Sequence, residues 1–313
     1  MATREPAGSR DDRSRALRET VAVDPNGRSR RSTSHAWPAV IAGITAFSFS
    51  APLYKISGAP PAVGSALRFA YGAVFLALVA WRAGALRPGP GFTPAAAAGA
   101  IVGLEVVIWN EATGRIGAGP STVIVNTASL WVMLLTVIVL RRPVGLRPVA
   151  GAAVVLCGLA LLRGTGEHRL GLTGIALAIA AAALYGAYIL TFERAVGAAR
   201  NGISPVLWST VVAAPVSAAC AVALGESWHL GVTQHAWLAL LGVAVQACGW
   251  LLIARSLSSF SAVAVSVLLL LQPALAAGWG VAFLNETLIA IQVVGIAIVL
   301  LGVAIARPRA ERV

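Results

Sequence analysis

Residues 292–305 read QVVGIAIVLLGVAI, and residues 148–161 read PVAGAAVVLCGLAL. Both lie within longer apolar runs, and about twenty apolar residues are enough for a helix to cross the hydrocarbon core of a bilayer. Similar runs recur along the chain, in which 58% of the 313 residues are hydrophobic and the mean hydropathy is +0.81. The sequence therefore predicts an all-α integral membrane protein.

Ten apolar runs are candidates for membrane-spanning helices. They cover residues 37–54, 62–81, 94–113, 120–140, 147–163, 172–192, 204–224, 235–254, 261–283 and 288–306. The flanking segments 1–36 and 307–313 are expected to be tails. The first is expected to be disordered, because it is rich in Arg, Ser and Asp and almost free of apolar residues.

The net charge of +12 follows the predicted topology. With the N-terminus inside, most Lys and Arg residues fall in the tails and loops of the cytoplasmic side, as the positive-inside rule requires. We therefore expect a multi-pass protein of the cell (inner) membrane with both termini in the cytoplasm. The excess of Lys and Arg over Asp and Glu is explained by the orientation of the protein in the lipid bilayer, which is its expected partner. No nucleic-acid partner is expected.

The two runs quoted above indicate an internal repeat. At an offset of 144 residues, Gly151 falls on Gly295 and Gly158 on Gly302. The predicted repeats, 37–163 and 172–306, hold five spans each, and an odd number makes the second copy insert upside down. Inverted repeats are typical of secondary transporters, with the substrate site near the midplane where the repeats meet.

Several short motifs carry a family resemblance. They are Ala66-Leu67-Arg68-Phe69, Gln272-Pro273, and Leu284-Asn285-Glu286 followed by Gln292 and Gly295. Because these motifs follow one another in this order and spacing, the chain resembles the drug/metabolite transporter superfamily, in its ten-helix form with two EamA-type domains. A weaker resemblance, to the threonine/homoserine exporter branch, rests on Gly58-Ala59-Pro60, Arg141-Arg142-Pro143-Val144 and Leu172-Thr173-Gly174. The resemblance implies an exporter of small metabolites, and it implies that Pro273 is a gating hinge.

Polar residues within the predicted spans are few, and they exclude most enzymes. No Asp follows Asp24, and the His residues from His168 onward all fall in loops. Two catalytic aspartates, a haem ligand set or a zinc site cannot be assembled from what remains. We therefore expect no enzyme, no metal and no cofactor.

Glu105 is the leading functional candidate. It lies deep in the third predicted span, and a buried carboxyl group in a membrane is by default a functional hypothesis, suited to trading a proton against substrate. Glu105 and Trp109 are four residues apart, hence on one helix face, and Gln246 and Trp250 have the same spacing in the equivalent eighth span. The two pairs are expected to line a central cavity from both sides.

Other roles remain open for several of these side chains. Glu105 could instead form a structural ion pair with Arg68, which enters the second span at a similar depth, and a pair that breaks during transport would satisfy both interpretations. Asn126 and Gln272 line the cavity or form hydrogen bonds between helices.

The sequence thus favours a secondary transporter that exports small metabolites, amino acids or related compounds first, by alternating access as a proton antiporter. A multidrug exporter or an uncoupled facilitator is the alternative within transport, and a non-transporting scaffold or sensor the alternative of another class. The expected partners are a small-molecule substrate, protons and lipid, and a homodimer is left open.

Overall fold

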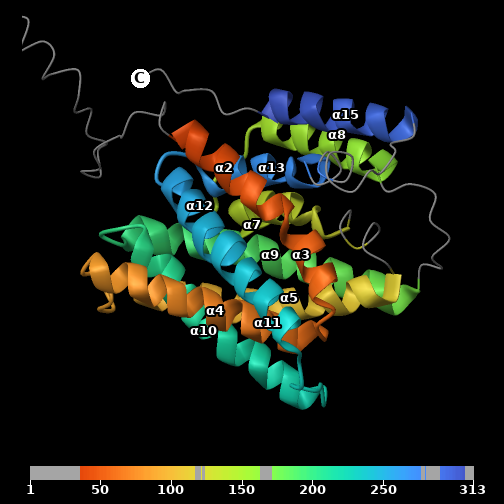
Figure 1. The fold of residues 1–313 in the computed structure, drawn as a ribbon. Coiled ribbons are helices and arrows are strands. Elements are labelled where there is room, and N and C mark those ends of the chain that lie inside the picture. The colour runs from red at the N-terminus through yellow and green to blue at the C-terminus, as the bar shows by residue number, and fades with distance from the viewer. Residues whose placement is uncertain are drawn as a thin grey trace, which may run out of the picture.

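The computed structural model describes residues 36–116, 121, 124–162, 171–275, 279 and 290–306. Every regular element in this part of the chain is a helix (Figure 1), as the sequence predicts. The predicted tails, apart from Ala36, lie outside the described residues, and so does the motif Leu284-Asn285-Glu286.

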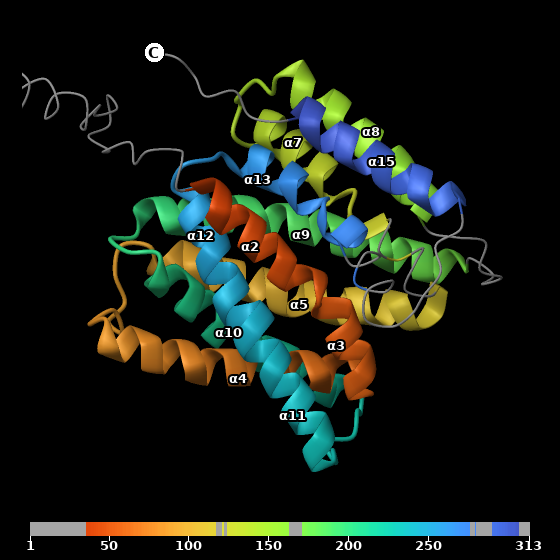
Figure 2. The ribbon, with the colours of Figure 1, turned by 45° about the horizontal axis from the view of Figure 1, so that its top comes forward.

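The described helices have the following bounds. In chain order they are α2 (Ala36–Ser48), α3 (Ser50–Ser57), α4 (Pro61–Arg82), α5 (Phe92–Ile116), α7 (Ala128–Ile138), α8 (Leu146–Leu162), α9 (Leu172–Ala198), α10 (Ile203–Ala223), α11 (Val232–Leu240), the π-helical segment η2 (Leu241–Gly249), α12 (Trp250–Leu257), α13 (Ala262–Leu269) and α15 (Ala290–Ala306). The segments α11, η2 and α12 form one continuous rod, which crosses the bundle beside α2 and α3 (Figure 2).

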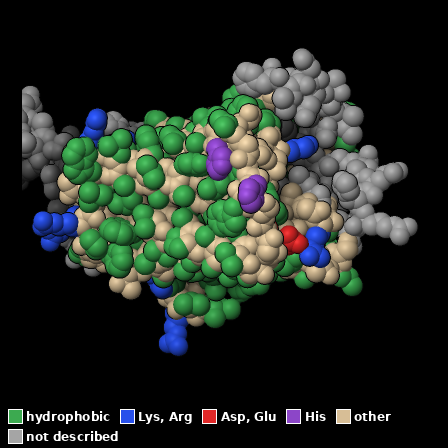
Figure 3. Space-filling model, turned by 60° about the horizontal axis from the view of Figure 1, so that its bottom comes forward, with side chains coloured by type: hydrophobic (Ala, Val, Ile, Leu, Met, Phe, Trp, Pro, Cys, Tyr) green, Lys and Arg blue, Asp and Glu red, His purple; other side chains and the backbone are tan. Residues whose placement is uncertain are grey.

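Six helices of the described chain are long and apolar enough to cross a membrane. They are Trp37–Ser57, Pro61–Arg82, Phe92–Ile116, Leu172–Ala198, Ile203–Ala223 and Val232–Leu257. Four shorter apolar helices lie at Ala128–Ile138, Leu146–Leu161, Ala262–Leu275 and Val293–Ala306. Apolar side chains cover most of the face seen in Figure 3, with Lys and Arg near its margins. The class of a multi-pass helical membrane protein is thus confirmed, while the count of ten spans stays a prediction.

Contacts between α8 and α15 show how the two halves are related. A Cβ atom on Gly151 would lie 2.7 Å from the carbonyl oxygen of Gly302, and one on Gly158 would lie 2.7 Å from that of Gly295. The offset of 144 residues turns the first contact into the second, because it carries Gly151 to Gly295 and Gly158 to Gly302. This exchange of contacts indicates a pseudo-twofold axis that passes between the two helices. The repeated glycines are where these helices approach most closely, as small residues allow in membrane bundles.

The first membrane span, expected over 37–54, runs from Trp37 to Ser57 and is interrupted within its length. Phe49 separates α2 from α3. Pro52 has no N–H to donate to the carbonyl of Ser48, and its ring clashes with that carbonyl, so the helix bends at this point.

The fourth helix of each half is also interrupted. Turns at Asn126–Thr127 and at Leu270–Leu271 stand at equivalent positions, 144 residues apart. In the second half the cause is Pro273, which cannot donate to the carbonyl of Leu269, where α13 ends. In the first half, which has no proline here, the hydroxyl group of Thr127 donates to the carbonyl oxygen of Ile124 at 2.6 Å.

The start of α4 depends on a carboxylate from elsewhere in the chain. Oε2 of Glu226 accepts hydrogen bonds from the backbone N–H groups of Ala62 at 2.9 Å and Val63 at 2.8 Å. These groups have no partner within the helix, and a negative charge at this end is favoured by the helix dipole.

We expect Glu226→Ala to lower the free energy of unfolding by about 1–2 kcal/mol, as the loss of a helix cap does. Thermal unfolding of the purified protein in detergent measures the change. The control is Glu111→Ala, since Glu111 forms an exposed i,i+4 pair with Arg115 that contributes about 0.5 kcal/mol or less. Equal melting temperatures for the two variants would contradict a stabilising role for the Glu226 cap.

Candidate functional site

A cavity of about 630 Å³, counting its open mouth, lies between the two halves of the protein. Its lining residues are Phe47, Ser50, Arg68, Val102, Glu105, Trp109, Val125 and Asn126 from the first half and Tyr185, Gln246, Trp250 and Gln272 from the second. The structure thus brings together seven of the eight side chains that the sequence singles out. The eighth, Pro273, follows Gln272 and does not line the cavity.

Two pairs of side chains with the same spacing line this cavity, one from each half. Glu105 and Trp109 are four residues apart on α5 and share one face. Gln246 lies in η2, and Trp250 follows at the start of α12. In a π-helical turn the hydrogen bonds span five residues, and such turns occur often at functional sites. Gln246 and Trp250 both line the cavity.

Arg68 lies at the centre of a polar network that joins the halves. It is 7% exposed. Its Nη2 donates to Oε1 of Gln246 at 3.1 Å, and its Nη1 donates to Oγ of Ser50 at 3.5 Å. Nε2 of Gln246 in turn donates to Oγ1 of Thr210 at 3.2 Å. These contacts use two of the five N–H groups of the guanidinium, and within the described part of the chain its Nε has no hydrogen-bond partner.

The carboxyl group of Glu105 has a different environment. The residue is only 5% exposed, yet no described residue donates a hydrogen bond to it. The ion pair found within 4.0 Å in the described chain is Arg115–Glu111, at 2.7 Å. Glu105 and Arg68 therefore line one cavity without forming a direct ion pair, and the pairing considered from the sequence is not formed in this structure.

The aromatic side chains that line the cavity come from both halves, Phe47 and Trp109 from the first and Tyr185 and Trp250 from the second. The ring of Trp250 packs edge-on against Phe47 at 5.1 Å and against Tyr188 at 4.8 Å between ring centroids. Tyr185 stacks on Tyr188 at 6.1 Å and itself lines the cavity. The wall offers a flat apolar surface next to the charged groups.

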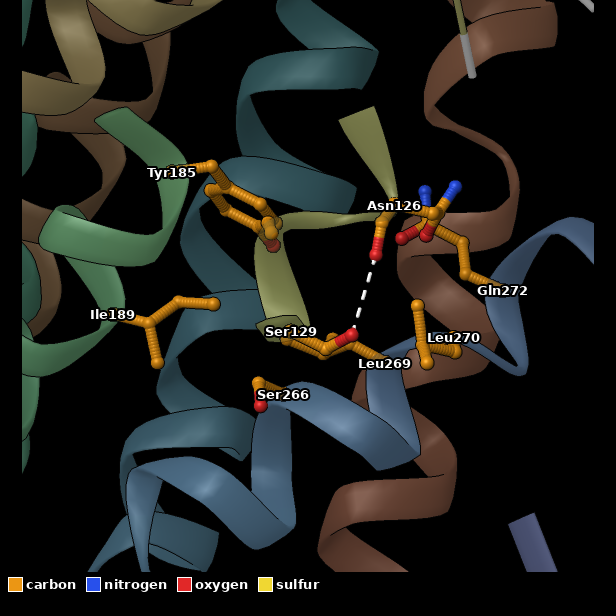
Figure 4. A pocket seen from close by; sticks show the side chains of 9 residues that line it. Asn126, Ser129, Tyr185, Ile189, Ser266, Leu269, Leu270 and Gln272 are labelled. Atoms are coloured by element: carbon orange, nitrogen blue, oxygen red, sulfur yellow. Dashed lines mark hydrogen bonds between the residues drawn. The ribbon is translucent and has the colours of Figure 1, made fainter. Parts of the chain in front are cut away.

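A second, smaller cavity of about 250 Å³ continues from the first along the breaks of the fourth and ninth helices. Both cavities are lined by Asn126, Tyr185 and Gln272. Figure 4 shows the side chains of Asn126 and Gln272 close together, opposite Tyr185, with Ser129 near the carbonyl of Asn126, to which it donates at 3.4 Å. Nε2 of Gln272 also donates to the carbonyl oxygen of Phe47 at 3.0 Å, at the bend of the first helix. The interrupted helices thus meet around the site.

Sequence reasoning missed Ser50 and Tyr185. Ser50 lies in the cavity wall because Pro52 bends the first helix, and that proline was a usable signal. Tyr185 stands in a run of small apolar residues. The periodicity of this run does not show which face of the helix lines the cavity and which faces lipid. No group of three or more His, Cys, Asp or Glu side chains that could hold a metal occurs in the part of the chain that is described.

Comparisons with known proteins agree with this architecture. The model of the EamA-like transporter family matches residues 36–164 and 172–307. A solved crystal structure superposes with a TM-score of 0.75 over 88% of this chain and 97% of its own chain, at 18% sequence identity, which shows a shared fold. No curated protein sequence gives a significant match.

Proposed function

The chain belongs to the EamA-like transporter family of small-molecule membrane transporters, and from this premise we propose that it exports small metabolites by proton antiport. Amino acids and related compounds are the favoured substrates. The protein works by alternating access in the cell (inner) membrane, with both termini in the cytoplasm. A homodimer is compatible with this function.

The observation that carries the proposal is the carboxyl group of Glu105, buried in the cavity between the halves without a hydrogen bond or ion pair from the described residues. A charged carboxylate in such a place is costly to keep unpaired. A bound proton removes the charge, and a substrate that supplies compensating charge can take the place of the proton. Competition between the two at one carboxyl group couples their movements in opposite directions.

The arrangement of the helices supports alternating access. Two halves related by a pseudo-twofold axis can exchange conformations, so that the cavity opens first to one side and then to the other. The interruptions at Phe49, Asn126–Thr127 and Leu270–Leu271 surround the cavity. Helix breaks at the site let the outer and inner ends of a span move separately.

Uptake into proteoliposomes tests the proposal. Vesicles with an acidic lumen are mixed with radiolabelled amino acids and, in parallel, with lipophilic cations, and protein-free vesicles serve as the control. We expect at least one amino acid to accumulate above equilibrium until the pH gradient is dissipated.

The other outcomes separate the alternatives. Accumulation of the lipophilic cations alone would favour a multidrug exporter. Equilibration of an amino acid without accumulation would favour an uncoupled facilitator. No movement of any compound would favour a scaffold or a sensor.

A further inference from the structure

The cavity is lined by one basic and one acidic side chain that are not in direct contact with each other. Arg68 and Glu105 are each more than nine-tenths buried, and they form no direct ion pair. The Nε group of Arg68 and the indole N–H of Trp109 have no hydrogen-bond partner among the residues that the structure describes. Buried groups of this kind are normally paired, because an unpaired buried charge is strongly unfavourable. A ligand bound in the cavity that both groups line would supply partners to both of them.

We propose that the cavity binds molecules that carry a carboxylate and a cationic nitrogen on one skeleton, the carboxylate at Arg68 and the nitrogen at Glu105. This inference rests on the proposed transport function and specifies its substrate class. The planar guanidinium is suited to a carboxylate, and its hydrogen bonds to Gln246 and Ser50 fix its position. The indole N–H of Trp109, one helical turn from Glu105, is a further donor beside the same cavity.

Proton antiport favours a ligand that places its cationic nitrogen, and not its carboxylate, at Glu105. A cationic nitrogen competes with a proton for the Glu105 carboxylate, as antiport requires. An anionic ligand without the nitrogen would bind best when Glu105 is protonated. It would therefore bind together with the proton and not in competition with it. A cationic ligand without the carboxylate would leave Arg68 without an ion-pair partner among the described residues. A ligand with both poles satisfies the two residues at once.

The apolar remainder of such a ligand has a defined place. Phe47, Tyr185 and Trp250 line the cavity next to Arg68 and Gln246. Aromatic faces accept flat or branched apolar groups, and they also attract cations. Compounds with an apolar side chain and both charged poles therefore fit best.

Binding of three related probes tests the inference. L-phenylalanine carries both poles, phenethylamine lacks the carboxylate, and 3-phenylpropionate lacks the nitrogen, while all three keep the phenylethyl skeleton. The binding of each probe to the purified protein in detergent is followed by tryptophan fluorescence, since Trp109 and Trp250 line the cavity. L-leucine, 3-methylbutylamine and 4-methylpentanoate repeat the test without a ring.

We expect each amino acid to bind at least about 10-fold more tightly than either of its single-pole analogues, a difference of about 1.4 kcal/mol. Glu105→Gln should bring the affinity for L-phenylalanine down to that for 3-phenylpropionate. Arg68→Gln should bring it down to that for phenethylamine, and Arg68→Lys should retain part of the preference. Glu111→Gln, outside the cavity, is the matched control and should keep the preference of the wild type.

The wild-type comparison stands even if an Arg68 variant fails to fold. Equal affinities within both probe series, or no binding of either amino acid, would overturn the inference. Preferential binding of the amino acids without any transport would uphold the binding mode and refute the transport function. Transport of amino acids without preference for both poles would refute the binding mode alone.

Discussion

Glu105→Gln is expected to abolish the accumulation of substrate in acid-loaded proteoliposomes, with an initial rate lower by about 100-fold, or about 2.7 kcal/mol. Glutamine keeps the size of the side chain but can neither carry a negative charge nor release a proton. The variant therefore loses the group for which proton and substrate compete. Glu105→Asp keeps the charge on a shorter side chain and should retain measurable uptake.

A matched control lies on the same helix. Glu111 is also in α5, but it is partly exposed and paired with Arg115, so Glu111→Gln should transport at close to the wild-type rate. Expression and melting temperature are compared for all variants, to separate coupling from folding. Undiminished, gradient-driven uptake by Glu105→Gln would contradict the assigned role and point to another coupling group.

Gly99→Val is expected to cause the largest loss of stability among these variants, about 3 kcal/mol, at the upper end of the range for overpacking. A Cβ atom on Gly99 would overlap the carbonyl oxygen of Ser209 and lie 2.9 Å from Cβ of Val212 on α10. Backbone atoms cannot rotate away as a flexible side chain can, so α5 and α10 must separate. Thermal unfolding in detergent measures the loss.

Gly114 provides the matched control on α5. A Cβ atom there would meet no atom within 4 Å among the described residues outside the adjoining turns of its own helix, and valine has a somewhat better helix propensity than glycine. Gly114→Val should therefore leave the melting temperature unchanged or raise it slightly. If both variants were equally stable, the close approach of α5 and α10 would be in doubt.

Much of the fold was predictable because it depends on composition and repetition. Apolar runs indicate membrane helices from the sequence alone, and the glycines at 151, 158, 295 and 302 mark the α8–α15 interface because only small residues allow such close contact. That Glu105, Trp109, Gln246 and Trp250 line one cavity could be predicted from their spacing, since a helix places residues four apart on one face; their role in binding stays a prediction.

The remaining features depend on interactions that no local pattern reveals. No local sequence pattern predicts the π-helical form of η2. The break at Asn126–Thr127 has no proline beside it from which it could have been predicted. The relation between Arg68 and Glu105 was ambiguous, because depth in the membrane says nothing about the rotation of each helix. Their rotation determines whether they form a pair or line a shared cavity.

Proton movement caused by substrate tests the central claim most directly. Wild type and Glu105→Gln are reconstituted in vesicles that contain a pH-sensitive dye, and the membrane potential is clamped with potassium and valinomycin. Each amino acid of the uptake panel is then added outside. The account predicts that the lumen of wild-type vesicles becomes more alkaline with at least one amino acid, because protons leave as substrate enters, and that Glu105→Gln gives no signal. Entry of a labelled amino acid through the wild-type protein at constant luminal pH would contradict the account.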